Sequence, residues 1–204
     1  GKRVMNIISQ LNQAAIILKD EFPFLLEIIV YVWGIQFVNT VLGGRLRVLG
    51  ILPRSPIGLV GIFASPFIHG DWNHITMNTL FFLAMGSMLI LRGQEGFLVV
   101  SISIMLIAGG LVWLFGRKAL HVGASSIIMG YWSYLLINAY LNPNLIDIIS
   151  AGLGLYYCGI HLTASLMANG PGVSEEGHIA GFIAGVVTAM YYEPIRKWLF
   201  MYVF

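Results

Sequence analysis

Long apolar stretches alternate with short polar connections along almost the whole chain of 204 residues. A helix needs roughly 20 apolar residues to cross a hydrocarbon core of about 30 Å. The pattern therefore predicts an all-α, polytopic membrane protein with six transmembrane helices. The fourth and sixth stretches are short and have polar residues at one end, as expected of helices that open onto a water-filled cavity. The six stretches are residues 24–42, 74–91, 96–115, 125–141, 145–167 and 178–192.

The first 22 residues show a different pattern. Apolar residues recur there at helical spacing, with Asn6, Gln10 and Gln13 on the other side. This pattern is typical of an amphipathic helix that lies in the membrane interface, and the polar residues are not those of a secretory signal peptide. We therefore divide the chain into an interfacial segment (1–22), a six-helix core (23–194) and a short C-terminal tail (195–204).

The connection between the first two apolar stretches, residues 43–73, is unusually long for a helical bundle. Its apolar part, residues 57–67, is too short to cross a membrane, which favours a re-entrant or interfacial hairpin. No internal repeat is visible, which argues against a transporter built from inverted repeats.

Composition agrees with a membrane protein and excludes some other classes. Hydrophobic residues make up 58% and charged residues 10% of the chain, and the mean hydropathy is +0.84. The net charge of +2 comes from scattered residues, so no nucleic-acid partner is indicated. The single cysteine, Cys158, excludes an intrachain disulfide. Six Lys and Arg residues lie on the side of the termini and five on the other, which favours cytoplasmic termini.

Ser125 and His178 stand at the mouths of two apolar stretches, each among small residues. One interpretation is that these residues ease close packing of membrane helices. The other is a catalytic pair, because a serine nucleophile needs a base and histidine has a suitable pKa near neutrality. Glu175 and Glu176 are expected to be solvated, so the pattern indicates a Ser–His dyad rather than a triad.

His74 and Asn78 are four residues apart and therefore share one face of the second expected span. They can join helices through hydrogen bonds, or they can donate to an oxygen on which negative charge develops. A helix that begins at Ser125 would add free backbone N–H groups and the positive end of its dipole.

The motifs, in this order, resemble those of the rhomboid intramembrane serine proteases over about residues 58–187. The order and spacing together are specific, whereas each motif alone is weak. The matches are His74-Ile-Thr-Met-Asn78 to the family's His-x-x-x-Asn, Gly123-Ala-Ser125 to its Gly-x-Ser, and Gly177-His178-Ile-Ala-Gly181 to its His-x-x-Gly.

The resemblance implies a role for each of these residues. Ser125 would be the nucleophile and His178 the base. His74, Asn78 and the backbone N–H of Ser125 would form the oxyanion hole. His69 matches a further recurring histidine, which is expected to organise the first loop.

Two positions depart from the family pattern. Ser126 replaces the usual glycine after the nucleophile, which leaves a second hydroxyl beside Ser125, although the Gly-x-Ser frame favours Ser125. Met129 replaces an aromatic residue that stacks on the histidine, and its sulfur can also contact a ring. We expect His121 and His161 to have packing roles, and the carboxylates of a His-Glu-x-x-His metal site are absent from the sequence.

The resemblance implies a serine endopeptidase that cleaves membrane-anchored proteins in the lipid bilayer, without a cofactor or metal. We expect it in a bacterial cytoplasmic membrane. The loop 169–177, rich in Gly and Pro, is expected to form a mobile lid over the cavity. Two alternatives stay open: a catalytically inactive rhomboid-like module that binds transmembrane helices, and a small channel or transporter.

Overall fold

The computed structural model describes residues 2–167 and 175–203, and nearly all of them are helical. The prediction of an all-α protein is therefore confirmed. An isolated bridge between Ile51 and His121 is the strand-like pairing found in the described residues. The helices are α1 (Lys2–Val41), η1 (Arg45–Leu49), α2 (Pro56–Ala64), η2 (Ser65–Phe67), α3 (Trp72–Leu89), η3 (Ile90–Arg92), α4 (Gly93–Phe115), α5 (Ser125–Leu141), α6 (Leu145–Met167), α7 (Glu175–Met190) and α8 (Tyr192–Tyr202).

Six long helices correspond to the six expected spans. α5 and α6 have the predicted ends, and α3, α4 and α7 begin a few residues earlier than predicted. α3 begins early because Asp71 caps it: the Asp71 side chain accepts a hydrogen bond of 2.8 Å from the backbone N–H of His74. Within residues 2–167 and 175–203, two helical stretches are long and apolar enough to cross a membrane by length and composition, Met5–Val41 and Trp72–Phe115. That all six helices cross a bilayer stays a prediction.

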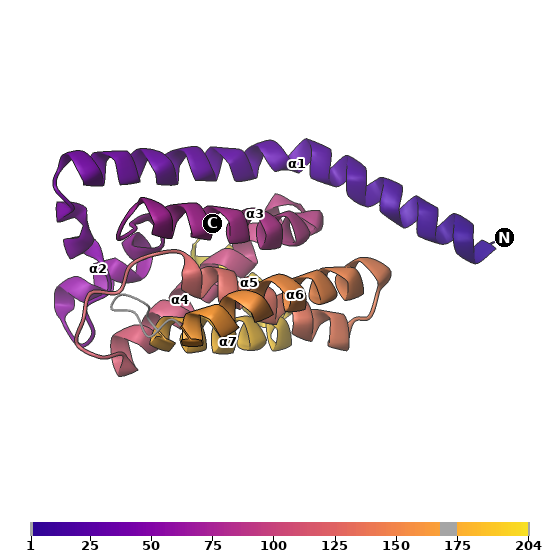
Figure 1. Cartoon of the computed structure of the whole chain (residues 1–204). Coiled ribbons are helices and arrows are strands. Elements are labelled where there is room, and N and C mark those ends of the chain that lie inside the picture. The colour runs from indigo at the N-terminus through magenta and orange to yellow at the C-terminus, as the bar shows by residue number, and fades with distance from the viewer. Residues whose placement is uncertain (1, 168–174, 204) are drawn as a thin grey trace.

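The N-terminal segment is not a separate helix. α1 continues through Pro23, so residue 22 is not a helix boundary. Proline lacks a backbone N–H and can bend a helix without ending it, and α1 is visibly bent (Figure 1). The C-terminal tail is also helical, as α8.

The long connection after α1 folds against the end of α4. Ile62 of α2 lies where a side chain at Gly109 would be. The backbone N–H of Arg54 donates to the carbonyl oxygen of Trp113 at 3.0 Å, and its guanidinium donates to Leu114. This segment is therefore a set of short helices packed on the bundle, in which α2 folds back along the preceding chain, with Gly58 against Leu52 and Gly61 against Gly50. That this hairpin enters a membrane stays a prediction.

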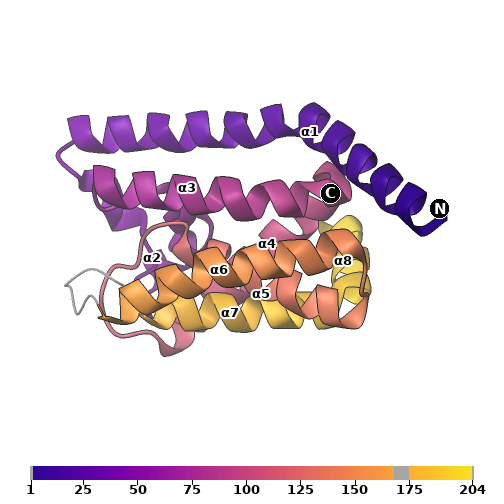
Figure 2. The same cartoon turned by 45° about the vertical axis from the view of Figure 1, so that its right-hand side comes forward.

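α3, α5 and α7 run in the same direction and begin at the same end of the bundle (Figures 1 and 2). Gly181 of α7 packs on the backbone of Ser126, and Gly185 packs on that of Gly130. Both pairs advance by four residues, which requires α5 and α7 to be parallel. α5 lies at the centre, and its residues 127–135 are all buried. We call the shared end, where these three helices begin, the motif end.

Candidate active site

Gly123 brings the second-span motif to the start of α5. A Cβ at this position would lie 2.7 Å from Nε2 of His74 and 3.3 Å from Nδ2 of Asn78. Its φ of +108° is a conformation that residues with a side chain rarely adopt. Its N–H donates to the carbonyl oxygen of Ser65 at 2.9 Å. The glycine of the Gly-x-Ser motif is therefore required by both space and backbone conformation.

Ser125 is the first residue of α5 and is partly exposed. The N–H groups in the first turn of a helix have no partner within that helix, and the positive end of the helix dipole lies there. His74 and Asn78 therefore lie beside a backbone that presents N–H groups next to the Ser125 hydroxyl.

The two polar residues of α3 differ in their hydrogen bonding. Nδ1 of His74 accepts a hydrogen bond of 3.4 Å from the N–H of Gly70. This assigns the ring proton to Nε2, the atom that faces Gly123. Asn78 is 4% exposed, and its Nδ2 has no hydrogen-bond partner among the described residues. Two donors thus face the same small space beside Ser125.

His178 lies in the first turns of α7 and is buried, with 6% of its surface exposed. It precedes Gly181 by three residues and so shares its helix face. Since Gly181 contacts Ser126 and the two helices are parallel, His178 lies one turn closer to the motif end, beside the start of α5. Ser133 maintains this register by donating to the carbonyl oxygen of Phe182 at 2.8 Å.

His69 packs edge-on against the ring of His74, with the ring centroids 5.1 Å apart. It is 1% exposed, and neither ring nitrogen has a hydrogen-bond partner among the described residues. Burial, together with the neighbouring His74 and against the opposing effect of Asp71, lowers the pKa of His69 to about 3. Its carbonyl oxygen accepts from Asn39 of α1. The neutral ring of His69 thus supports His74 from the loop, in keeping with the expected organising role.

One expectation about the surroundings is wrong. Glu176 is not simply solvated, because its Oε1 lies 3.3 Å from Nε of Arg117 and its side chain is 32% exposed. This ion pair joins the loop before Ser125 to the start of α7. The sequence did not predict this ion pair, because Arg117 and Glu176 are 59 positions apart and no motif contains both.

Other residues singled out from the sequence have structural surroundings. Nε2 of His121 lies 3.1 Å from the carbonyl oxygen of Arg117, and its backbone pairs with Ile51. Met129 is buried in the core. The side chains of Cys158 and His161, and residues 169–174 of the expected lid, lie outside the described residues.

Comparison with known proteins agrees with the motifs. The sequence model of the Rhomboid domain family matches residues 57–194. Uncharacterized proteins of Mycobacterium tuberculosis (strain H37Rv) and Mycobacterium bovis are each 33% identical to the chain over 183 residues, which cover 85% of this chain and 76% of theirs. An uncharacterized protein of Mycobacterium leprae is 31% identical over 147 residues, 68% of this chain and 59% of its own length.

Proposed function

The chain belongs to the rhomboid family of integral membrane proteins, and from this premise we propose that it is an intramembrane serine endopeptidase with Ser125 and His178 as its catalytic dyad. The observation that carries the proposal is the buried, unpartnered Nδ2 of Asn78 beside Gly123. A buried donor without a partner costs about 1–3 kcal/mol. A ligand oxygen in that space would recover this cost.

The proposed reaction begins with proton transfer from the Ser125 hydroxyl to the imidazole of His178. The serine oxygen attacks the carbonyl carbon of the scissile peptide bond and forms a tetrahedral intermediate. Its negative oxygen accepts hydrogen bonds from Asn78 Nδ2, from the Nε2–H of His74 and from the backbone N–H of Ser125.

Collapse of the intermediate breaks the carbon–nitrogen bond, and His178 returns the proton to the leaving amine. Water then attacks the acyl-enzyme while His178 accepts a proton from it. The ester bond to Ser125 breaks, His178 returns the proton to the Ser125 oxygen, and the second product leaves. Each step uses groups of this chain and water.

The substrates that fit this proposal are proteins anchored in the membrane. The motif end is where a peptide must arrive, because α3, α5 and α7 all begin there (Figure 2). We further propose that all six long helices cross the bilayer, that the termini are cytoplasmic and that residues 23–194 form the catalytic core. The relatives from Mycobacterium fit a bacterial membrane.

Mass mapping of a fluorophosphonate adduct tests the proposal. The adduct should form on Ser125, disappear in Ser125→Ala and persist in Ser126→Ala, the matched control. Ser125→Ala and His178→Ala should both lack cleavage of a transmembrane reporter while keeping the parent's melting temperature in detergent. An adduct on Ser126 would reverse the choice of nucleophile. A folded protein without any adduct would overturn the proposed protease.

A further inference from the structure

A cavity of about 280 Å³ extends from the motif end into the bundle, between α1, α3, α4 and α5. Its lining includes Ala124, the neighbour of Ser125, at one end. At the other end an aromatic cluster closes it: the Phe97 ring lies 5.8 Å from the rings of both Phe24 and Tyr131. The mechanism proposed above uses Asn78 at one end of this cavity and assigns no role to the rest of it.

The cavity is elongated. Its lining on α1 runs from Phe24 to Val32 and on α4 from Phe97 to Met105, which is about 12 Å along each helix axis. This length suits a single extended alkyl chain.

Almost the whole lining is apolar, and the deep polar groups satisfy one another. The Ser101 and Tyr131 hydroxyls are 2.6 Å apart. A dry cavity of about 150 Å³ accepts a six-carbon ring, so by proportion this one has room for roughly 11 carbon atoms. Water gains few hydrogen bonds in such a space, but an alkyl chain gains burial.

Among the described lining residues, buried polar atoms without a hydrogen-bond partner occur only at the end near Ser125. They are Nδ2 of Asn78 and the two ring nitrogens of His69. The buried Pro66 and the exposed Phe67, both in η2, cover this end. A group that enters there must therefore be small and must accept a hydrogen bond, which excludes a phospholipid headgroup.

The flank between α1 and α4 connects the cavity to the bilayer. Ile28 and Ile29 on α1, with Leu98 and Ile102 on α4, line the cavity and are partly exposed. A membrane-dissolved amphiphile can enter by this route without crossing the water phase.

We propose that this cavity binds a medium-chain free fatty acid, with its carbonyl oxygen at Asn78 Nδ2 and its alkyl chain between α1 and α4. A bound fatty acid would place its carbonyl oxygen at Asn78 Nδ2, which is the donor that the proposed function assigns to the oxyanion. Binding itself does not depend on that function. Only the consequence, competition with substrate, rests on it.

Photolabelling with a diazirine analogue of decanoic acid tests binding in the Ser125→Ala variant, in which the proposed chemistry is absent. The label should map to residues 24–32 and 97–105, saturate, and be displaced by excess decanoic acid. Labelling should fall at least tenfold in Ile102→Trp, which fills the cavity, and stay unchanged in the control Ile183→Trp, which adds the same bulk at an exposed position of α7. Decanoic acid should raise the melting temperature of the parent and of Ile183→Trp, but not of Ile102→Trp.

Label spread over lipid-facing residues such as Val30 and Phe37, without displacement, would overturn the proposal. So would labelling by a photoreactive phospholipid that decanoic acid does not displace, because the occupant would then be a lipid tail. Competitive inhibition of reporter cleavage in the parent would support the link to Ser125. Labelling without a fluorophosphonate adduct in the parent would leave the binding site intact and overturn the proposed protease.

Discussion

At one end of the bundle the Asp147 carboxylate is hydrogen-bonded by three side chains, while at the other end Asn78 Nδ2 and both ring nitrogens of His69 find no partner among the described residues. Both sets of groups are buried: Asp147 is 4% exposed and Asn78 is also 4% exposed. The two sets of groups are equally buried but differ in their hydrogen bonding. The network around Asp147 holds helices together, whereas the donors at the other end lack an acceptor.

The network around Asp147 fastens the starts and ends of three helices. Arg92 donates to its Oδ1 at 2.8 Å, and Asn138 and Asn144 donate to its Oδ2 at 2.7 and 2.6 Å. The Asn144 side chain in turn caps α6 by accepting from the backbone N–H of Asp147. Arg92 also lies over the ring of Tyr134. Every acceptor oxygen of this carboxylate is therefore used within the protein.

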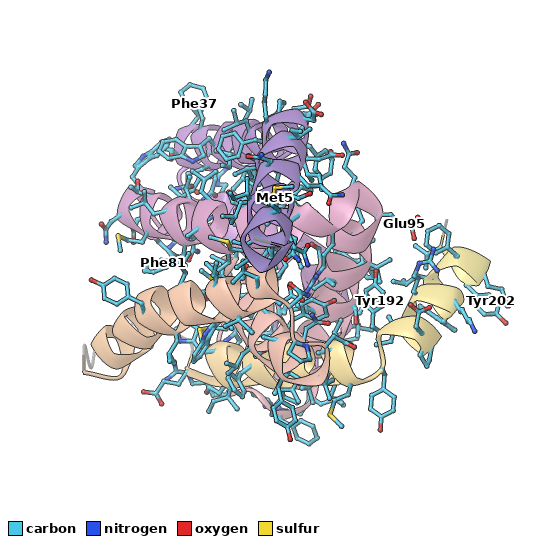
Figure 3. The ribbon with its side chains drawn as sticks, turned by 90° about the vertical axis from the view of Figure 1, so that its right-hand side faces the viewer. Met5, Phe37, Phe81, Glu95, Tyr192 and Tyr202 are labelled. Atoms are coloured by element: carbon cyan, nitrogen blue, oxygen red, sulfur yellow. The ribbon has the colours of Figure 1, made fainter. Side chains whose placement is uncertain are left out.

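A second ion pair at the same end joins α8 to α4. Arg196 donates to Glu95 through its Nε at 2.6 Å, and Figure 3 shows Glu95 and Tyr192 on neighbouring parts of the two helices. Tyr202, further along α8, points away from the bundle (Figure 3). This end is thus closed by interactions between helices, although Nε of Arg92 also lacks a partner among the described residues. The motif end differs in that its unpaired donors lie beside a cavity.

The comparison predicts the largest loss of stability at Asp147. Asp147→Ala should lower the free energy of unfolding by about 3–5 kcal/mol, because it leaves the partly buried Arg92 without its carboxylate. Cleavage per folded molecule should not change. Glu193→Ala, an exposed carboxylate nearby, is the control and should unfold like the parent. Loss of activity in a folded Asp147→Ala protein would contradict the view that the Asp147 end serves stability and the motif end serves catalysis.

Two asparagines sharpen the same division. Asn78→Ala should reduce the cleavage rate by about 10²–10³, or roughly 2.7–4 kcal/mol of transition-state stabilisation, with little change in melting temperature. Asn138→Ala should do the reverse, losing about 1.5–3 kcal/mol of stability with an unchanged rate. Steady-state kinetics and melting curves of both variants test these two predictions. An Asn78 variant that unfolds easily but cleaves normally would make Asn78 a helix-joining residue.

The sequence predicted the helices well where polar or flexible residues interrupt the apolar runs. α5 and α6 have their predicted ends because Gly123 precedes one and Pro143 lies between the two. The change from an amphipathic to an apolar pattern near residue 22 is not a helix boundary, because α1 continues through Pro23, and the division into segments stays a prediction. Family membership is confirmed, and the roles of the site residues stay predictions.

The contacts around the site could be predicted only in part. The motifs told us which residues belong together, but not that Gly123 has positive φ or that Asn78 lacks a partner. The pair of Arg92 with Asp147 and the pair of Arg117 with Glu176 join residues 55 and 59 positions apart. No short-range pattern encodes such pairs, because the fold brings them together.

The motif end should also lose some stability as the pH falls, which is a smaller effect than those above. The folded pKa of His69, about 3, lies below its ordinary value of 6.5, so the unfolded chain binds a proton more readily than the folded protein. The stability that depends on a neutral His69 is therefore complete above pH 6.5 and is lost as the pH falls toward 3. Lowering the pH from 6.5 to 5 should cost about 2 kcal/mol, at about 1.4 kcal/mol per pH unit.

Melting in detergent at pH 7 and pH 5 measures this effect. His69→Asn is the comparison, because it cannot take up the proton and should have a flatter dependence on pH. If the parent and His69→Asn lose the same stability between these values, the burial of His69 does not control the acid response of the motif end.

The smallest predicted effect concerns the ion pair that joins the motif end across its surface. Arg117 and Glu176 are 59% and 32% exposed, and exposed pairs contribute about 0.2–1 kcal/mol. A double-mutant cycle with Arg117→Ala and Glu176→Ala should therefore give a coupling free energy of unfolding within that range. The coupling should shrink in 1 M NaCl, where charges are screened over about 3 Å. Because the pair joins the loop before Ser125 to the start of α7, each single variant should also lower kcat slightly without changing KM. A coupling above about 2 kcal/mol, insensitive to salt, would contradict this view and would make the motif end as firmly held by buried charge as the end around Asp147.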